Sequence, residues 1–278
     1  MSTLPKIVFS GARGAFGELA ARQHFGEKAD IAPVIGFDAV FGAVKRKKAD
    51  FGVIPIENTC AGSVHQNYDM LLSSKLYIVA EGFLSVNHFL VAKSGTSIDA
   101  VRRVFSHPQA LAQCARFLKR HPKMKQIEAE NTALAAKAVS EDGQADTAAI
   151  ASSRAAADFG LEILAPNIQD RDDNVTRFLV VSRDRSEGGK APRKTSIAFS
   201  LKNTPGALFK ALGVFALRDI DLFKIESRPI HGKGFEYLFH LDCCGDIRDE
   251  VVRNAISHLK EIAPYYQLLG SYDIGNTV

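Results

Sequence analysis

Three short polar runs in this chain carry side chains that could do chemistry. They are Ile54 to Ser63, Ser106 to Gln113, and Asp170 to Phe178. Their carboxylate, carboxamide, hydroxyl and guanidinium groups act through hydrogen bonds and charge, and the chain has no Ser-His-Asp order, zinc-ligand spacing or flavin signature. The runs therefore indicate positioning and polarisation of a small ligand.

Each run also has a purely structural interpretation. In the first, Ser63 could cap a helix and Glu57 could be solvated. In the second, a cap followed by Pro108 at the first helical position accounts for most of the pattern. Asn131-Thr132 is first of all a helix cap, and the charged half of the third run, Asp170 to Asp173, is expected to be solvated.

Thr176 and Arg177 differ because they lie where an apolar strand pattern has begun. An arginine on a strand that faces a cleft usually has an anionic partner, which is either a structural carboxylate or a substrate. The glycine-rich turn Gly11 to Gly17 fits neither the dinucleotide pattern nor the Walker pattern, so nucleotide binding is not expected. Residue types alone predict a small anionic ligand in a cleft.

The elements that must position these runs alternate between strands and helices. Strands are predicted at 6–10, 31–35 and 51–56, helices at 18–25, 38–47 and 63–72, and an extended stretch at 76–92. This alternation predicts a parallel sheet. The extended stretch is expected to carry the chain into a second lobe at about 84–165, and a strand at 175–182 to return it to the first.

The second lobe is predicted to have the same alternating character. Its helices are expected at 98–103, 108–120, 132–141 and 152–159, and its strands at 104–105, 125–128 and 147–151. Two such lobes joined by two crossings would leave a cleft between them, and clefts of this kind bind small ligands.

A charged, glycine-rich run at 184–193 is the predicted linker between a domain at 1–183 and one at 194–278. The later domain is predicted to contain, in order, strand 195–201, helix 206–217, strands 222–227 and 235–241, helix 247–262 and strand 265–271. That order is βαββαβ, a ferredoxin-like α+β unit.

Composition excludes several classes of protein. With 278 residues, 46% hydrophobic and 24% charged, the chain can build two globular cores. Its net charge of +4 is scattered, which argues against nucleic-acid binding. No apolar run approaches a membrane span and no targeting segment is evident, so a cytoplasmic location is expected. The adjacent Cys243 and Cys244 suit neither a disulfide framework nor a metal site.

Taken in order, the motifs resemble those of the prephenate and arogenate dehydratases. The motifs are Pro55-Ile56-Glu57-Asn58, Gly62-Ser63, Ser106-His107-Pro108-Gln109-Ala110-Leu111, Asn131-Thr132-Ala133 and Asn174-Val175-Thr176-Arg177-Phe178. Gly206-Ala207-Leu208 and Glu226-Ser227-Arg228-Pro229 resemble the phenylalanine-binding motifs of that family's carboxyl-terminal ACT domain. The resemblance covers essentially the whole chain.

The resemblance implies an α/β catalytic domain shaped like a type II periplasmic binding protein, followed by the ACT domain. Its implied catalytic residues are Thr176, Glu57 and Ser106, and its implied substrate-binding residues are Arg177, Asn58, Thr59, Gln113, Phe178, Thr132 and Asn174. The implied L-phenylalanine effector site comprises Asn203, Pro205, Gly206, Ala207, Leu208, Glu226, Ser227, Arg228 and Pro229. No cofactor or metal is expected. The chain is expected to form a homodimer or a homotetramer.

The implied reaction is the decarboxylating dehydration of prephenate to phenylpyruvate under phenylalanine feedback. Dehydration of arogenate is the first alternative, and a non-catalytic two-lobed sensor of small carboxylates is a second. One departure concerns the amino-terminal turn, where the family's proline, threonine and serine are replaced by Ala12, Ala15 and Gly17. Hydroxyl contacts from that turn are therefore not expected.

Overall fold

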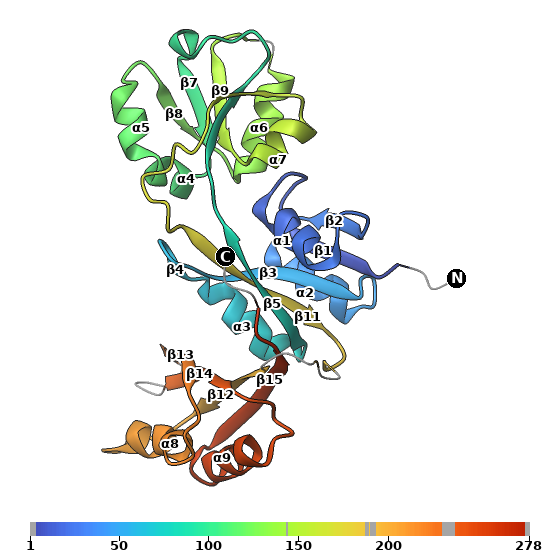
Figure 1. Ribbon diagram of the computed structural model, residues 1–278, viewed down its shortest axis with the longest axis vertical. Helices are drawn as coiled ribbons and strands as arrows, with labels where there is room; N and C mark the ends of the chain where they lie inside the picture. The colour runs from blue at the N-terminus through green and yellow to red at the C-terminus, as the bar shows by residue number, and fades with distance from the viewer. Residues whose placement is uncertain (1–3, 143, 187–188, 190–192, 230–236, 276–278) are drawn as a thin grey trace. The chain divides into compact units, whose positions relative to one another are not determined.

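The computed structural model describes residues 4–142, 144–186, 189, 193–229 and 237–275 (Figure 1). Half of the predicted linker at 184–193 and the first two residues of the predicted strand at 235–241 lie outside these ranges. Contacts divide the chain into two compact units, of which the first is built from residues 1–64 and 82–178 and the second from residues 65–81 and 179–276.

The first sheet carries two of the three polar runs. Its strands are β1 (Lys6–Ser10), β2 (Asp30–Val34), β3 (Phe51–Asn58), β4 (Gly62–Ser63), β5 (Tyr77–Ser85) and β11 (Val175–Ser182). Their order is β2-β1-β3-β11-β5, with β4 paired to β3, and β1 is parallel to both of its neighbours. Helices α1 (Phe16–Phe25) and α2 (Phe37–Lys45) make the crossovers. The predicted return of the chain at 175–182 is confirmed, because β11 lies beside β3.

The second sheet, in the same unit, has the order β10-β6-β9-β7-β8. Its strands are β6 (Phe89–Ala92), β7 (Arg103–Ser106), β8 (Lys125–Glu128), β9 (Thr147–Ala151) and β10 (Glu162–Ala165). Its helices are η1 (Ile98–Ala100), α4 (Pro108–Gln113), α5 (Ala115–Arg120), α6 (Thr132–Glu141) and α7 (Ser153–Asp158). The two-lobed α/β fold is thus confirmed, although this sheet is mixed because β6 is antiparallel to β9 and β10.

Three local predictions for this unit were wrong. The helix expected at 98–103 is a single 3₁₀ turn, and β10 was not expected. The helix expected at 108–120 is two helices that meet at Cys114. The break has a clear cause, since the Gln113 carbonyl accepts from the Asp170 backbone N–H at 2.7 Å and the Arg116 N–H donates to the Asp170 carboxylate at 3.0 Å.

Helix caps were predicted more accurately. His107 accepts from the Gln109 N–H ahead of Pro108, and Asn131 accepts from the Leu134 N–H, as expected. Ser63 is not a cap. It lies in β4, where it pairs with Glu57 of β3, and helix α3 (His65–Ser74) begins two residues later.

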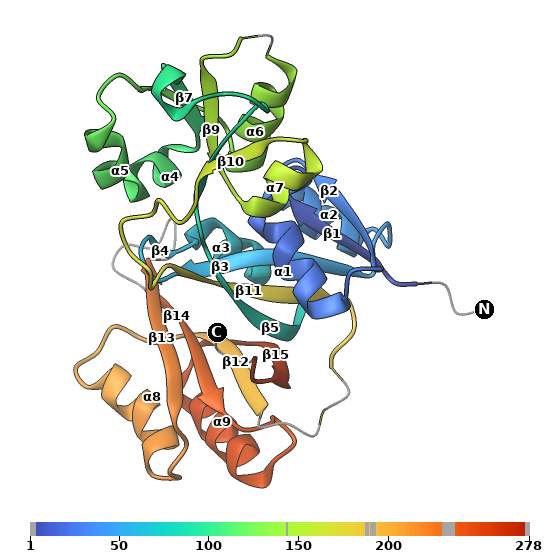
Figure 2. The ribbon, with the colours of Figure 1, turned by 45° about the horizontal axis from the view of Figure 1, so that its top comes forward.

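The second unit contains α3 and a four-stranded antiparallel sheet, with order β13-β14-β12-β15. Its strands are β12 (Arg193–Ser200), β13 (Leu222–Pro229), β14 (Tyr237–Cys244) and β15 (Tyr265–Asp273), and its helices are α8 (Ala207–Ala216) and α9 (Glu250–Ile262). Figure 2 shows α8 and α9 together on one face of this sheet, where they enclose an apolar core. The predicted ferredoxin-like βαββαβ unit is confirmed. No helix in the described ranges is long and apolar enough to span a membrane.

Candidate functional site

The first and third polar runs meet where β3 ends and β11 begins, and Thr59 joins them. Its N–H donates to the Val175 carbonyl at 2.9 Å, and its hydroxyl accepts from the Val175 N–H at 2.9 Å. The same hydroxyl donates to the Asp173 carbonyl at 2.6 Å. Because the Thr59 hydroxyl donates and accepts within the protein, it fixes the two strands relative to each other rather than offering a hydrogen to a ligand.

Asn58, the last residue of β3, has a side-chain orientation set by the backbone. The N–H groups of Cys60 and Ala61 donate to its Oδ1 at 3.0 and 2.9 Å. Its Nδ2 must therefore lie on the opposite side, where it donates to Asn174 Oδ1 at 2.7 Å and to Thr176 Oγ1 at 2.9 Å. Since backbone N–H groups can only donate, this assignment of the amide oxygen and nitrogen is unambiguous.

The direction of that last bond decides what Thr176 can do. Its hydroxyl oxygen accepts from Asn58 Nδ2, an atom that can only donate. Within the described part of the chain the Thr176 side chain has no other hydrogen-bond partner, so its O–H hydrogen is not consumed by the protein. Thr176 is only 8% exposed. The site thus holds a buried hydroxyl whose oxygen is fixed and whose hydrogen can be donated to a ligand.

Gln113, from α4 of the second lobe, is hydrogen-bonded to the group formed by Asn58, Asn174 and Thr176. Asn174 Nδ2 donates to Gln113 Oε1 at 3.1 Å, which is possible because Asn174 Oδ1 is already taken by Asn58. His88 Nε2 lies 2.9 Å from the same Gln113 oxygen. Gln113 Oε1 thus has two donors, and the NH₂ of the same planar carboxamide is directed away from them.

The two chain crossings between the lobes are bonded to each other beside this group. Val86 N–H donates to the Asn174 carbonyl at 2.8 Å, and Ile168 N–H donates to the His88 carbonyl at 2.9 Å. The His88 N–H in turn donates to Gln169 Oε1 at 3.0 Å. His88 lies on the first crossing and Asn174 on the second, so the polar group is built on the segments that connect the lobes.

Ser106, Thr132 and Glu57 are further predicted site residues. Ser106 is fully buried and its hydroxyl donates to the Ile150 carbonyl at 2.7 Å, which ties β7 to β9. Thr132 is the first residue of α6, next to the Asn131 cap. Glu57 is half-buried in the β3–β4 ladder, beside Asn58. No described hydrogen bond links Ser106 or Thr132 to Asn58 or Gln113.

Thr176, Arg177 and Phe178 are all buried at the start of β11. Successive residues of a strand point to opposite faces, so Thr176 and Phe178 share one face and Arg177 is on the other. A ligand that contacts both Thr176 and Arg177 must therefore lie at the end of the strand. The charged loop before it is solvated as predicted, with Arg171 paired to Asp173 at 2.6 Å and both exposed. This ion pair lowers the pKa of Asp173.

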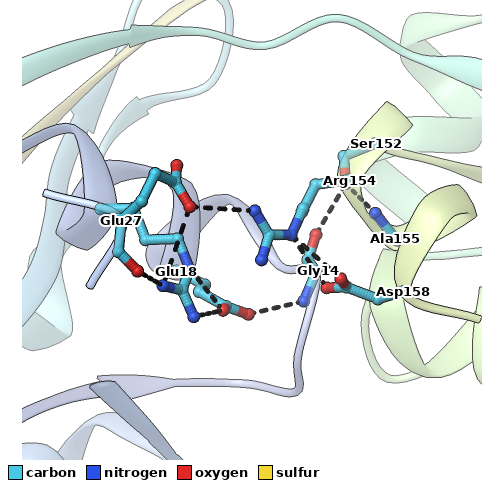
Figure 3. Close-up of polar contacts among 8 residues, drawn as sticks. Gly14, Glu18, Glu27, Ser152, Arg154, Ala155 and Asp158 are labelled. Carbon is cyan, nitrogen blue, oxygen red and sulfur yellow. Dashed lines mark hydrogen bonds and ion pairs between the residues drawn. The ribbon is translucent and has the colours of Figure 1, made fainter. Parts of the chain in front are cut away.

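The glycine-rich turn at 11–17 lies against α7 of the second lobe (Figure 3). Ser152, the cap of α7, donates its hydroxyl hydrogen to the Gly14 carbonyl at 2.6 Å. A Cβ on Gly14, whose φ is +80°, would lie 2.5 Å from Ala155 Cα. The Gly14 N–H donates to the buried carboxylate of Glu18 at 2.8 Å. The turn is therefore a close contact between lobes, made with the backbone atoms of Gly14.

Charged side chains surround that contact. Arg154 of α7 lies 3.3 Å from Glu27 of the first lobe and 3.0 Å from Asp158 of its own helix (Figure 3). Glu18 also accepts from Arg22 at 2.7 Å. The pairs involving Arg154 are solvent-exposed, so each stabilises the contact only weakly.

The predicted effector residues of the second unit lie in two segments, one in the loop and helix start after β12 and the other on β13, and these two strands are not neighbours. Gly206, with φ +75°, precedes α8 in the loop after β12, whereas Glu226 and Arg228 lie on the edge strand β13. β14 separates the two strands. Arg228 is paired to Asp69 of α3 at 2.8 Å, and Glu226 lies 3.1 Å from Lys224.

A pocket of about 400 Å³ lies beside the start of α8 in this unit. Its walls are Leu201, Lys202, Thr204, Ala207, Lys210, Glu261, Ile262, Ala263 and Pro264. Ala207 is the one predicted effector residue among them, so the pocket and the predicted effector site do not coincide.

Residue types and motifs singled out Asn58, Gln113, Asn174 and Thr176 but not His88. His88 follows Asn87 directly before the apolar strand β6, and nothing in that local pattern marks an imidazole that reaches Gln113 of α4. The only available signal was its place at a predicted crossing.

Two α/β lobes with buried polar groups at their crossings, followed by a ferredoxin-like unit, define a small-molecule-binding domain joined to an ACT-type domain. Family models agree: residues 7–186 match prephenate dehydratase and residues 195–259 match the ACT domain. The chain belongs to the prephenate dehydratase family. As a dehydratase it is a carbon–oxygen lyase.

Similar curated proteins include arogenate dehydratase/prephenate dehydratase 2, chloroplastic, of Arabidopsis thaliana, which is 45% identical over 98% of this chain and 74% of its own. The bifunctional chorismate mutase/prephenate dehydratase of Aquifex aeolicus is 42% identical over 96% and 73%. Among solved structures, prephenate dehydratase from Arthrobacter aurescens in complex with L-Phe has a TM-score of 0.89 and 32% identity, covering 96% of this chain and 90% of that one. GqqA, described as a novel type of quorum quenching acylase, has a TM-score of 0.89 and 31% identity over 96% and 97%.

Proposed function

We propose that this protein converts prephenate to phenylpyruvate by concerted or stepwise loss of carbon dioxide and water. The observation that carries the proposal is the Asn58–Thr176 hydrogen bond, which leaves the Thr176 hydrogen available for a ligand. Dehydration needs a donor at the departing hydroxyl group, and the proposed donor is Thr176. The family membership supplies the substrate class.

In the proposed mechanism the ring carboxylate leaves as carbon dioxide, and its bonding electrons move into the ring as the carbon–oxygen bond at the opposite position breaks. Aromatisation drives both cleavages. The Thr176 hydroxyl donates to the departing oxygen as negative charge develops there, so the bond strengthens mainly in the transition state. The oxygen leaves as water after taking up a proton from solvent. Positioned donors of this kind contribute typically about 10²- to 10⁴-fold.

The substrate's remaining charges require partners as well. In the proposal Arg177 grips the side-chain carboxylate at the end of β11, and the NH₂ of Gln113 donates to a second substrate oxygen. Phe178, on the same face as Thr176, keeps water from the ring carboxylate and thereby favours loss of its charge. Glu57, Asn58, Thr59, Ser106, Thr132 and Asn174 complete the proposed site.

The test is to incubate the purified protein with prephenate and to measure phenylpyruvate formation. Steady turnover with saturation is expected. The curated relatives carry arogenate dehydratase names as well as prephenate dehydratase names, so arogenate is the second candidate substrate. Comparing kcat/KM for the two substrates, with phenylalanine as the product from arogenate, decides between them. Turnover of neither substrate would overturn the proposal.

We also propose that L-phenylalanine regulates the enzyme through the ACT domain, taken as residues 194–278 after a linker at 184–193 and a catalytic domain at 1–183. An L-Phe complex is known for the related Arthrobacter aurescens protein. In the proposal a second copy of the chain supplies the missing neighbour, so that the Gly206 loop of one copy meets β13 of the other. Exposed apolar residues support such pairing, because Phe209 is 80% and Leu217 86% exposed.

The regulatory proposal has its own measurement. Activity and sedimentation are followed while L-phenylalanine is titrated, and inhibition together with a homodimer or homotetramer is expected. Ser227→Lys on β13, which belongs to the other unit than the proposed catalytic residues, should abolish inhibition but keep turnover. The proposed location is cytoplasmic, which agrees with four free cysteines, whereas several plant relatives are chloroplastic by name.

A further inference from the structure

His88 is a buried side chain of the crossing segment that the proposed mechanism does not use. It is 2% exposed, and its ring packs edge-on against Phe16 of α1 with centroids 5.8 Å apart. Its only side-chain hydrogen bond in the described structure joins Nε2 to Gln113 Oε1 at 2.9 Å. A buried imidazole with a single partner in a binding site requires an explanation beyond packing.

The direction of the His88–Gln113 bond follows from the neighbouring groups. Backbone N–H groups fix Asn58, Asn58 fixes Asn174, and Asn174 Nδ2 then donates to Gln113 Oε1. That atom is therefore the amide oxygen, which can only accept. The hydrogen of the His88 ring must be on Nε2.

The surroundings also fix the charge of the imidazole. His88 Nδ1 is buried with no hydrogen-bond partner in the described residues, so a second ring hydrogen would have no acceptor. Burial lowers the pKa of His88, and the bond to Gln113 only partly opposes this effect. His88 is a neutral donor.

We propose that His88 is a positioning residue which, by donating Nε2–H to Gln113 Oε1, holds the Gln113 NH₂ toward the substrate. Without that donor the carboxamide could rotate by 180° and present its oxygen to an anionic substrate, where it would repel a carboxylate instead of binding it. Because His88 lies on one crossing and Asn174 on the other, both must be in place for Gln113 to present its NH₂. This inference rests on the proposed function, since it specifies how that site recognises its anion.

The central variant is His88→Phe, which keeps the ring packed on Phe16 and removes the donor. We expect kcat/KM for prephenate to fall by about 10- to 100-fold, the scale of loss that a misplaced group causes. His88→Gln, whose amide NH₂ can reach the position of the ring Nε2–H, is expected to recover most of the activity. His121→Phe is the matched control, because His121 lies in the same lobe and, among the described residues, its ring hydrogen-bonds only to the Phe117 carbonyl. It should leave turnover unchanged.

A double-variant cycle separates positioning from a general loss of structure. If His88 acts through Gln113, then adding His88→Phe to Gln113→Leu should cost nothing further, whereas unrelated defects multiply. Circular dichroism and thermal melting confirm that each variant is folded. Full activity of His88→Phe, or multiplying losses in the double variant, would overturn the role of His88. A wild-type protein that forms no phenylpyruvate would instead overturn the proposed function, so the two failures are distinguishable.

Discussion

Asn58 Nδ2 lies 2.9 Å from Thr176 Oγ1 and donates to it, and this one bond sets the direction in which the threonine can donate. Asn58 can do so because the Cys60 and Ala61 N–H groups occupy its Oδ1. The loop that follows β3 thereby orients a hydroxyl on β11.

Thr176→Val should lower kcat by about 10²- to 10⁴-fold with a much smaller change in KM, because it removes a donor that acts mainly in the transition state. Thr176→Ser should retain a substantial part of the activity, since the hydroxyl is kept. Initial-rate kinetics with prephenate measure both. Near-normal turnover by Thr176→Val would remove Thr176 from the proposed mechanism.

Asn58→Asp should abolish turnover although the side chain is nearly the same size. A carboxylate has no hydrogen to donate, so it would face the oxygens of Asn174 and Thr176 and capture the Thr176 hydrogen. The unfolding free energy should also fall, by about 1–3 kcal/mol, because buried acceptors lose their donor. Kinetics and urea unfolding test this, and wild-type activity in Asn58→Asp would contradict the assigned direction of the bond.

Gly14→Ala should destabilise the protein by about 2–5 kcal/mol, since it combines a positive φ with a clash against the α7 backbone. Gly95→Ala is the matched control, because Gly95 has the same φ of +80° and nothing within 4 Å of an added Cβ. The control should cost only about 1–2 kcal/mol. Equal losses of unfolding free energy would show that Gly14 is required for its φ alone.

Ala15→Ser should stabilise the protein by about 0.5–2 kcal/mol. Ala15 is the N-cap of α1 with φ −70° and ψ 156°, and it offers no side-chain acceptor to the first turn. A serine there supplies one. Ala12→Ser, in the same turn but outside the cap position, should change the melting temperature little. A neutral or destabilising effect of Ala15→Ser would mean that burial of the hydroxyl outweighs the cap.

The stability of the second unit should fall as the pH drops below 6.5. Burial lowers the pKa of His240 to about 4, so the folded form stays neutral while the unfolded form takes up a proton between pH 6.5 and 4. The loss approaches about 2–3 kcal/mol at the acid end of that window. Urea unfolding at pH 7.5 and pH 5 measures it. His240→Phe, which can still pack against Tyr68, should flatten the dependence, whereas exposed His258→Phe should not.

The sequence predicted elements well where a clear period coincided with a cap. Helix α6 begins and ends where its pattern and Asn131 placed it, and β11 matches the predicted strand at 175–182. Errors arose where a distant segment intervened, because no local pattern contains such a contact. Asp170 interrupts the helix at Cys114, and pairing with Glu57 places Ser63 in a strand.

In the site, too, local motifs predicted which residues take part, whereas contacts between distant segments decide how they are bonded. Motif resemblance indicated Asn58, Gln113, Asn174 and Thr176, and in the structure these four are linked by hydrogen bonds. Which atom donates to which depends on three-dimensional neighbours, so the sequence could not provide it. His88 was missed because its role depends entirely on a partner in another element. Thr59 stays a predicted substrate-site residue, and the sequence could not show that its hydroxyl also joins β3 and β11.

One series of hydrogen bonds in the site is insensitive to pH. It runs from the Cys60 and Ala61 amides through Asn58 and Asn174 to Gln113. Carboxamides do not change charge in the physiological range, and His88 at the far end is kept neutral by its surroundings. The pattern of donors and acceptors presented to a ligand is therefore the same at mildly acidic and mildly alkaline pH. In the proposed site, selectivity for an anion therefore depends little on moderate changes of pH, because the carboxamides that set the donor pattern do not change charge.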